Sequence, residues 1–269
     1  MNVKAENDKD VKIIVATHKK YQMPKEKMYL PVHVGSKNKE SIGYQRDDEG
    51  DNISEKNPYY CELTGLYWAW KNLKADYLGL SHYRRYFAEN TKIPAKEENR
   101  FKNVLTYEKA DKLLDEVDII LPTKRKYYIE NIYDHYKKTM YIEPLDETRC
   151  ILEEKYPEYL PEFDKMHKRT SAHLFNMFIM KKDKLDEYLT WLFDILFELE
   201  KRCDPSQYDS FHARYLGRIS ERLLDVWINT KGYKYKEVKF MSIQKVHWMK
   251  KGTSFIKSKF TGKKYEKSF

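Results

Sequence analysis

The sequence predicts a single α/β domain with an irregular middle. Short apolar runs that suit buried strands alternate with longer runs of helical periodicity, in the order strand, strand, helix, strand, helix, strand. The 269 residues, 41% of them hydrophobic, can bury one large core or two small ones. No internal repeat and no Gly/Ser-rich linker divides them. We therefore expect one domain over residues 11–241, followed by a tail over residues 242–269.

Four strands and two helices are predicted in the first half of the chain. The apolar runs that predict strands cover residues 12–17, 29–34, 76–81 and 117–121. Asn57 is expected to cap a helix with Pro58 at its first position. The apolar stripe of this helix is Tyr59, Leu63, Leu66, Trp70 and Leu73. A second helix should run from Thr106 to about Glu116.

The middle of the chain is less regular. Residues 123–145 are rich in Tyr and Lys and show no clear period, and residues 147–156, followed by Pro157 and Pro161, indicate a helix and a turn. An insertion over one edge of the sheet is the simplest interpretation.

The second half predicts a buried strand over 174–180 with Asn176 inside it. Asp183 is expected to cap a long helix. The apolar face of that helix is Leu185, Leu189, Leu192, Leu196 and Leu199. A further helix should start at Asp204, be interrupted at Gly217 and continue over 220–229. A last strand is expected over 234–241.

The charge is concentrated at the carboxyl terminus. The chain has 51 Lys+Arg against 42 Asp+Glu, a net charge of +9. Residues 245–269 hold eight Lys, one Glu and five aromatic residues. Basic residues near an anionic lipid surface contribute about 1 kcal/mol each, and aromatic rings settle among the headgroups. This tail therefore predicts contact with an anionic membrane, with a plain solvated tail and nucleic-acid binding as the alternatives.

Cysteine usage and hydropathy indicate the compartment. Cys61, Cys150 and Cys203 are odd in number and form no C-x-x-C pair, which argues against a disulfide framework and against a zinc site. Residues 1–10 do not look like a signal peptide, and no apolar run reaches the roughly 18 residues of a membrane span. We expect a cytoplasmic protein, attached peripherally at the inner face of the plasma membrane.

Several catalytic signatures are absent from the sequence. It contains no G-x-G-x-x-G, G-x-x-x-x-G-K-[ST], H-E-x-x-H or G-x-S-x-G motif. Dinucleotide-dependent oxidoreductases, P-loop enzymes, zincins and α/β-hydrolases therefore lose support.

The strongest local feature follows the third strand. The run Ser81–Phe87 places His82, Tyr83, Arg84 and Arg85 at a strand end, where open α/β sheets bind ligands. Guanidinium forks can hold a diphosphate and stabilise the charge that grows on a departing nucleotide. Adjacent residues of an extended segment point in opposite directions. One arginine should therefore face the ligand, while the other forms an ion pair with a carboxylate.

Seven runs of the sequence together carry a family resemblance. They are Ile14–Lys19, Asn52–Asn57, Tyr60–Thr64, Tyr67–Asn72, Gly79–Phe87, His173–Met180 and Gly217–Leu224. In these runs the chain resembles a family of bacterial capsular and exopolysaccharide biosynthesis proteins, long catalogued as a domain of unknown function. That family is similar to GT-A-type glycosyltransferases, and some members are thought to be galactofuranosyltransferases. The resemblance spans residues 11 to 241.

The resemblance implies a GT-A-like, Rossmann-like domain with a mixed, mostly parallel central sheet. It also implies an inverting hexosyltransferase that uses a UDP-sugar donor in capsular polysaccharide, exopolysaccharide or O-antigen synthesis. The acceptor would be an oligosaccharide or an undecaprenyl-linked glycan, and galactofuranose is one possible donor sugar. Two rival functions remain open. One is a non-catalytic nucleotide-sugar or glycan-binding subunit, and the other is RNA binding, for which the sequence holds no known motif.

The same resemblance, together with the arginine motif, implies a set of donor-binding residues. The set is Thr17, His18, Asn52, Asn57, Glu62, His82, Tyr83, Arg84, Arg85 and Asn176. Thr17 and His18 would line the nucleotide pocket, and Glu62 would hold a pair of hydroxyls unless it lies on a solvated helix face. A buried Asn176 needs a partner, which is either a sugar hydroxyl or a neighbouring backbone group.

Glu221 is the candidate general base. An inverting transfer needs a carboxylate to take the proton of the acceptor hydroxyl, and Glu221 is expected at the start of a late helix. A plain first-turn carboxylate that complements the helix dipole is the alternative.

The usual metal-binding Asp-x-Asp motif is missing. Only Asp8-Lys9-Asp10 has that spacing, and it precedes the first strand. Since arginines can neutralise a diphosphate without a metal, we expect no metal site, while Mn²⁺ or Mg²⁺ dependence remains possible.

Overall fold

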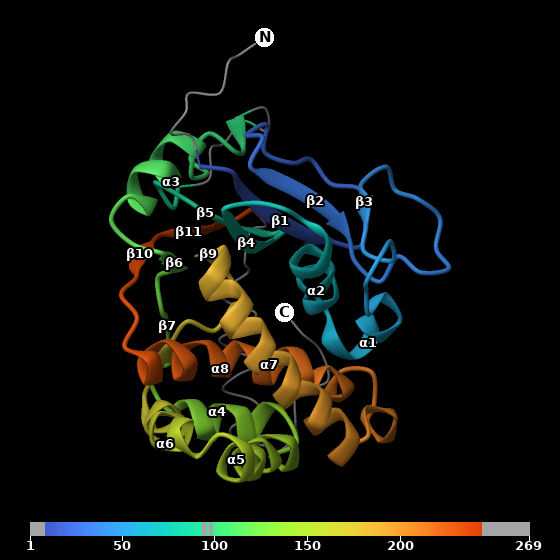
Figure 1. Cartoon of the computed structure of the whole chain (residues 1–269), viewed down its shortest axis with the longest axis vertical. Helices are drawn as coiled ribbons and strands as arrows, with labels where there is room; N and C mark the ends of the chain where they lie inside the picture. Colours follow the sequence, from blue (N-terminus) through green and yellow to red (C-terminus); the bar gives the residue numbers. More distant parts are fainter. Residues whose placement is uncertain (1–8, 93–95, 97–98, 244–269) are drawn as a thin grey trace.

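A nine-stranded sheet forms the centre of the molecule (Figure 1). The computed structural model describes residues 9–92, 96 and 99–243. The main sheet has the strand order β10-β6-β9-β4-β1-β2-β3, and β5 and β11 extend it beside β4. These strands are β1 Val11–Thr17, β2 Tyr29–His33, β3 Gln45–Arg46, β4 Tyr77–His82, β5 Arg85–Phe87, β6 Ile119–Pro122, β9 Phe178–Lys181, β10 Lys236–Val238 and β11 Phe240–Ser242. β7 (Arg125–Lys126) and β8 (Ser171–Ala172) form a separate pair.

The sheet is mixed and mostly parallel, as predicted. β1 is parallel to β2 and β4, β2 is parallel to β3, and β6 is parallel to β10. β9 runs antiparallel to both β4 and β6. The carboxyl ends of the parallel strands therefore meet at one edge, and the segment that leads into β9 reaches the same edge. We call this the carboxyl edge of the sheet.

Helices cover both faces of the sheet because its strands are apolar on both sides. In β1, Ile14 and Ala16 pack into one core, while Val11, Ile13 and Val15 pack into the other. The first face is covered by α2 (Leu63–Asn72), α7 (Lys182–Arg202) and α8 (Tyr215–Lys231), and the second by α3 (Tyr107–Leu114) (Figure 1). The predicted leucine face of α7 is buried throughout, which confirms that prediction.

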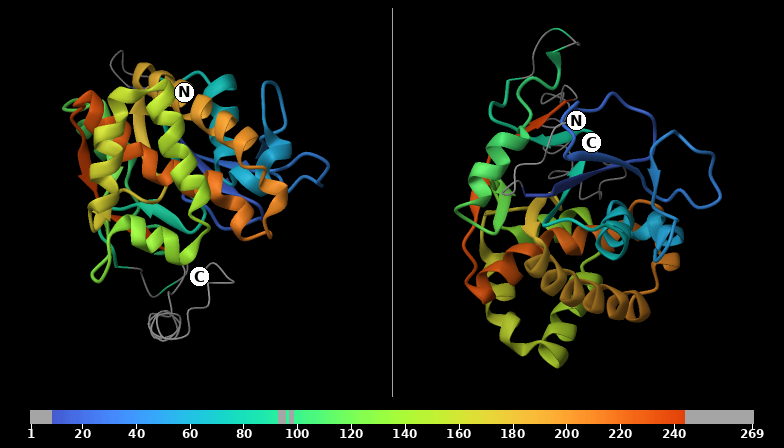
Figure 2. Two further views of the ribbon diagram at one scale, coloured as in Figure 1. Left: turned by 90° about the horizontal axis from the view of Figure 1, so that it is seen from below. Right: turned by 45° about the horizontal axis from the view of Figure 1, so that its top comes forward.

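The predicted insertion is a layer of three helices. They are α4 (Ile132–Thr139), α5 (Glu143–Lys155) and α6 (Leu160–Lys168), with a 3-10 turn at Pro157–Tyr159. They lie beyond α7 and α8 on the side away from the sheet (Figures 1 and 2). α4 falls in a segment without an obvious period. Its start is fixed by Asn131, whose side chain accepts a 2.7 Å hydrogen bond from the backbone N–H of Asp134.

The helix predicted from Asn57 is broken into two. α1 spans Asn57–Tyr60, and the chain turns at Cys61, with φ 53° and ψ −127°, before α2 begins. Asn57 caps no helix, since its amide donates to the Cys61 carbonyl (2.7 Å) and to Thr64 Oγ1 (3.1 Å).

Two other helix starts were also wrong. Asp183 lies in the first turn of α7, and its carboxylate accepts only from the adjacent Lys184 N–H. Asp204 starts a short 3-10 turn rather than a long helix. Gly217 lies inside α8 rather than interrupting it. The 3-10 helices of the described residues, besides the one before α6, are Ser54–Lys56, Pro205–Gln207 and His212–Arg214.

The strand predicted over 174–180 is shorter and starts later. Asn176 lies in a turn with φ 48°, and β9 begins two residues after it. The last predicted strand is divided into β10 and β11, which pair with β6 and β5 respectively. Among the described residues no helix is both long enough and apolar enough to cross a lipid bilayer. The predicted membrane-binding segment, 245–269, lies outside them.

Candidate active site at the carboxyl edge of the sheet

The sequence Ser81–Phe87 forms a tight hairpin at the carboxyl edge. His82 pairs with Arg85 across β4 and β5, which leaves Tyr83 and Arg84 in the turn between them. Ser81 closes the hairpin, because its hydroxyl donates a 2.6 Å hydrogen bond to the Arg85 carbonyl. The hairpin therefore separates the two arginines, as the sequence predicted.

Arg84 belongs to an exposed aromatic group. Its guanidinium lies 4.9 Å from the centre of the Tyr83 ring. The Tyr21 ring stacks on Tyr83, with 4.3 Å between the ring centres. His18, which follows β1, contacts both tyrosines edge to face. Partial burial, Lys19 and Arg84 lower the pKa of His18, so its imidazole is neutral at pH 7. Thr17 is buried beside it and donates to the Lys19 carbonyl at 2.7 Å.

Arg85 turns inward, toward two carboxylates. Its guanidinium lies 4.5 Å from the centre of the Phe175 ring. Burial lowers the pKa of Arg85, whereas Glu221 and Glu62 raise it. Arg85, rather than Arg84, is therefore the arginine placed to act with Glu221.

Glu62, His82 and Asn176 form a connected group next to Arg85. Asn176 donates to Glu62 Oε1 (2.7 Å) and to the Gly217 carbonyl (3.1 Å), and it accepts from the Ser220 hydroxyl (2.9 Å). His82 Nε2 lies 3.9 Å from Glu62 Oε1. The amide of Asn176 is thus satisfied within the protein, and it ties the turn before β9 to α8.

Glu221 lies in the second turn of α8, not in the first. Its carboxylate is 13% exposed and lies 3.8 Å from Arg218 and 3.9 Å from Arg222, beyond hydrogen-bonding distance. Gly217, one turn earlier, lies against Cys61, where a Cβ would make an ordinary van der Waals contact at 3.5 Å. A first-turn role in the helix dipole is therefore removed, and the candidate base faces the site.

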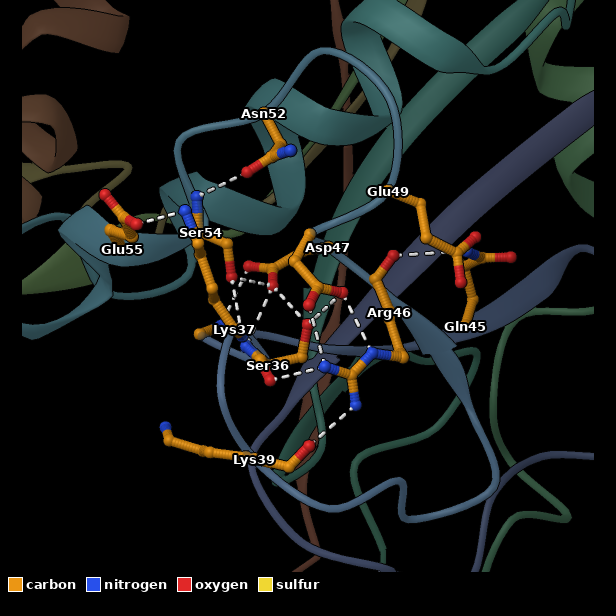
Figure 3. A network of polar contacts seen from close by, with 12 residues as sticks. Ser36, Lys37, Lys39, Gln45, Arg46, Asp47, Glu49, Asn52, Ser54 and Glu55 are labelled. Carbon is orange, nitrogen blue, oxygen red and sulfur yellow. Dashed lines mark hydrogen bonds and ion pairs between the residues drawn. The ribbon is translucent and has the colours of Figure 1, made fainter.

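A buried hydrogen-bond network holds the loops beside this site (Figure 3). Asp47, which is fully buried, accepts from the backbone N–H groups of Gly35 and Ser36 and from the hydroxyls of Ser36, Ser54 and Thr64 at 2.5–3.0 Å. We call this the Asp47 network.

Asn52 and Asn57, both predicted to bind the donor, lie at the Asp47 network. Asn52 accepts from the Ser54 N–H at 3.1 Å and shapes the loop. Asn57 donates to the carbonyl of Cys61, the residue before Glu62, and so helps to hold the backbone there. The hydrogen bonds of both side chains are local ones.

Two residues with positive φ meet at the site. Three non-glycine residues among those described have positive φ, and two of them are Cys61 and Asn176. Cys61 directly precedes Glu62, and Asn176 donates to it. Such conformations, held by their surroundings, gather at functional sites. Burial also raises the pKa of the Cys61 thiol to about 12, so this sulfur is not a nucleophile.

A buried histidine supports α8 from behind. His173 is fully shielded, and its Nδ1 hydrogen-bonds to Asp225 of α8 while its Nε2 lies 3.1 Å from Glu237 of β10. This arrangement fixes α8 against the sheet, and it thereby fixes the position of Glu221.

Two surface hollows lie elsewhere. One of about 470 Å³ lies between α7, the 3-10 turn before α6 and the end of α8, and one of about 260 Å³ lies at the start of β6. The first lies among helices, and the second lies at the amino end of a parallel strand. Open α/β sheets place ligands at the opposite edge, so the charged group around Glu221 is the better candidate.

A divalent metal has no evident protein site here. Within residues 9–92, 96 and 99–243, no three His, Cys, Asp or Glu side chains gather in a way that could hold a metal ion. Metal independence stays a prediction.

Sequence reasoning missed three charged residues of the site. Arg218 and Arg222 flank Glu221 on α8, and Arg125 of β7 lies close enough to influence Arg85. The sequence spacing of Arg218, Glu221 and Arg222 puts these side chains on one helical face and could have identified them. The helix interruption expected at Gly217 prevented this interpretation.

Comparisons with known proteins agree with this description. Residues 12–232 match the family described as "Domain of unknown function (DUF4422)". No curated protein matches the sequence. A solved structure, described as the WbbM bifunctional glycosyltransferase in its apo form, is similar with a TM-score of 0.78 and 34% identity over 87% of this chain. The match spans 45% of that longer chain. With its match over most of its length, this chain belongs to the DUF4422 family.

Proposed function

We propose that this protein is a glycosyltransferase. It would move a sugar, such as galactofuranose, from a UDP-sugar to a lipid-linked or oligosaccharide acceptor in surface polysaccharide synthesis. The similarity to a bifunctional glycosyltransferase supports the reaction class. The observation that carries the chemistry is the inward-facing Arg85 beside Glu221 at the carboxyl edge of the sheet.

The proposed reaction inverts the anomeric centre in one displacement. The acceptor oxygen attacks the anomeric carbon of the donor, the bond from that carbon to the diphosphate oxygen breaks, and UDP leaves with the bonding electron pair. Glu221 takes the proton of the acceptor hydroxyl. Arg85 stabilises the negative charge that develops on the leaving diphosphate. Mn²⁺ or Mg²⁺ is not required in this scheme.

Two further parts of the proposal concern the surroundings of the site. His18, Tyr21 and Tyr83 offer aromatic surface beside the diphosphate position, which suits a base or a sugar ring. Residues 245–269 would attach the protein to an anionic membrane that carries the acceptor.

The substitution Glu221→Gln tests the proposal. It keeps the shape of the side chain but removes the base, so UDP binding measured by calorimetry should persist while UDP release from a UDP-sugar with acceptor falls about 10²- to 10⁴-fold. Glu153→Gln, on the exposed side of α5, is the matched control and should keep full activity.

Three outcomes separate the alternatives. An active Glu221→Gln protein would exclude this base. Nucleotide binding by the wild type without turnover of any UDP-sugar would indicate the non-catalytic binding subunit. Turnover that requires Mn²⁺ and stops with EDTA would overturn the metal-free scheme.

A further inference from the structure

Arg85, Arg218 and Arg222 lie near Glu221, and a fourth guanidinium group, that of Arg125, lies near Arg85. Arg85 comes from β5, Arg125 from β7, and Arg218 and Arg222 from α8. We call them the arginine cluster. Arg125 and Arg218 are near enough to Arg85 to lower its pKa, after the larger effect of burial. Segments far apart in the sequence thus bring four positive charges to one place.

The carboxylates of the site compensate these cations only in part. Glu221 lies at 3.8 Å and 3.9 Å from Arg218 and Arg222, and Glu62 Oε1 accepts from Asn176. Burial acts against the charge of Arg218, but Glu221 and Glu62 raise its pKa above the ordinary value. Arg222 is 4% exposed, its Nε has no hydrogen-bond partner among the described residues, and burial lowers its pKa although Tyr127 and Glu221 raise it.

Arg222 Nη1 donates a 2.6 Å hydrogen bond to the Arg218 carbonyl, and three guanidinium groups of the arginine cluster lie over aromatic rings. The guanidinium of Arg85 lies over Phe175 at 4.5 Å, that of Arg125 over Tyr127 at 4.9 Å and that of Arg222 over Tyr136 at 4.5 Å. An aromatic ring occupies the flat face of a guanidinium, while the N–H donors point outward in its plane. These contacts fix the orientation of the cations without consuming the donors that bind anions.

Three arginines elsewhere in the described protein are paired with carboxylates. Arg202 hydrogen-bonds to three carboxylates, and Arg149 forms a two-point contact with Asp164 at 2.9 Å and 3.0 Å. Arg46 likewise contacts both oxygens of Asp48. In the arginine cluster, by contrast, no carboxylate among the described residues lies within hydrogen-bonding distance of a guanidinium group, which leaves room for another anion.

We propose that Arg125 and Arg218 complete, with Arg85, a metal-free binding site for a diphosphate group. Arg222 is the buried positive charge behind it. The proposal rests on the glycosyltransferase function proposed above and adds two residues to its site. The diphosphate could belong to a nucleotide donor or to a lipid-linked acceptor, since both carry the same chemistry.

Calorimetry in EDTA tests the site directly. The probes are inorganic pyrophosphate, UDP, uridine and geranyl diphosphate, titrated into the full-length wild type, Arg125→Gln and Arg218→Gln. Each substitution removes charge-assisted hydrogen bonds, so pyrophosphate should bind about 10- to 100-fold more weakly, while uridine should bind unchanged. Arg149→Gln, on the helical layer, is the control and should match the wild type.

The probes distinguish the two sources of the diphosphate. Weaker binding of UDP with unchanged geranyl diphosphate assigns the site to the donor, and the reverse assigns it to the acceptor lipid. Partial recovery in Arg218→Lys would show that charge rather than packing is responsible. Arg125 is exposed, so its variant should fold as the wild type does.

The inference fails if both variants bind pyrophosphate as tightly as the wild type, or if the wild type binds no diphosphate probe in EDTA. This failure is separable from that of the proposed function. Diphosphate binding by the wild type with no transfer from any UDP-sugar would contradict the function but support the site. Transfer by the wild type with unaffected binding in both variants would contradict the site alone.

Discussion

The Asp47 network and the arginine cluster both place charge at the carboxyl edge of the sheet, but they treat it in opposite ways. The carboxylate of Asp47 is fully buried and accepts five hydrogen bonds. Three of the four guanidinium groups of the arginine cluster lie against aromatic rings, and the shortest distance from the cluster to a carboxylate is 3.8 Å, between Arg218 and Glu221. The first region is complete without a ligand, whereas the second is not.

This difference separates structural charge from functional charge. A buried ion whose hydrogen bonds are all made stabilises one conformation, and its removal leaves its partners unsatisfied. A buried ion without partners reduces stability until a ligand supplies them. Hydrogen-bond satisfaction, rather than burial alone, therefore marks Asp47 as a structural residue and the arginine cluster as a binding site.

The largest effect on stability is expected for Asp47→Ala. This change leaves the backbone N–H groups of Gly35 and Ser36 and the Ser54 hydroxyl without an acceptor. The Ser36 and Thr64 hydroxyls keep only their longer bonds to Asp48 and to the Cys61 carbonyl, so the free energy of unfolding should fall by about 3–5 kcal/mol. Urea unfolding measures it, with Asp48→Ala as the control, because Asp48 is 17% exposed and pairs mainly with Arg46. A loss no larger than that of the control would show that the network is not what holds these loops.

An intermediate effect on stability is expected from the buried, neutral imidazole of His167. His167 of α6 is buried, its Nε2 has no hydrogen-bond partner among the described residues, and burial lowers its pKa to about 4. The unfolded chain, with a pKa near 6.5, binds the proton first as the pH falls. Stability should therefore fall between about pH 6.5 and pH 4.

Between pH 7 and pH 5, His167 is expected to lower the free energy of unfolding by about 2 kcal/mol. His167→Phe should lack it, so urea unfolding at the two pH values should show a flatter pH dependence in this variant. His135, whose pKa burial also lowers to about 4, and His18 and His33, whose pKa values burial lowers, remain in both proteins and contribute to the residual slope. Parallel pH profiles would show that the His167 ring is solvated or charged in the folded state.

The smallest effect is expected for Arg222→Met. Methionine fills a similar volume, and the nearest carboxylate to the lost charge, that of Glu221, is 3.9 Å away and beyond hydrogen-bonding distance, so the free energy of unfolding should stay within about 1 kcal/mol of the wild type. Arg202→Met, which removes three carboxylate contacts, should be less stable than Arg222→Met. If Arg222→Met lost more than about 3 kcal/mol, Arg222 would be a paired structural charge, and the contrast with Asp47 would disappear.

Local patterns predicted the sheet and the large helices well. β1, β4 and α7 follow from apolar runs and from leucines at helical spacing, because burial is decided there by neighbouring residues. The hairpin and β5, which follow the predicted strand 76–81, were not predicted. Glu221 remains a predicted base.

What the sequence could not show depends on distant contacts. The donors to Asp47 come from positions 35 to 64, and no local pattern joins them to one acceptor. Asn176 was placed in a strand because its neighbours are apolar, but its polar amide is satisfied only in the turn that contacts Glu62 and α8. The helix break at Cys61 could not be predicted, because neither a glycine nor a proline occupies the position of positive φ.

The backbone strain at Cys61 lowers the stability of the fold but restricts the position of the next residue, Glu62. The Cys61 backbone adopts a conformation that side chains rarely take, and holding it there costs about 1–3 kcal/mol. Glycine would accept the same turn without strain, although it would also loosen the peptide that carries Glu62. A cysteine at this turn therefore reduces the stability of the folded state, and in return it restricts the orientation of the Glu62 carboxylate.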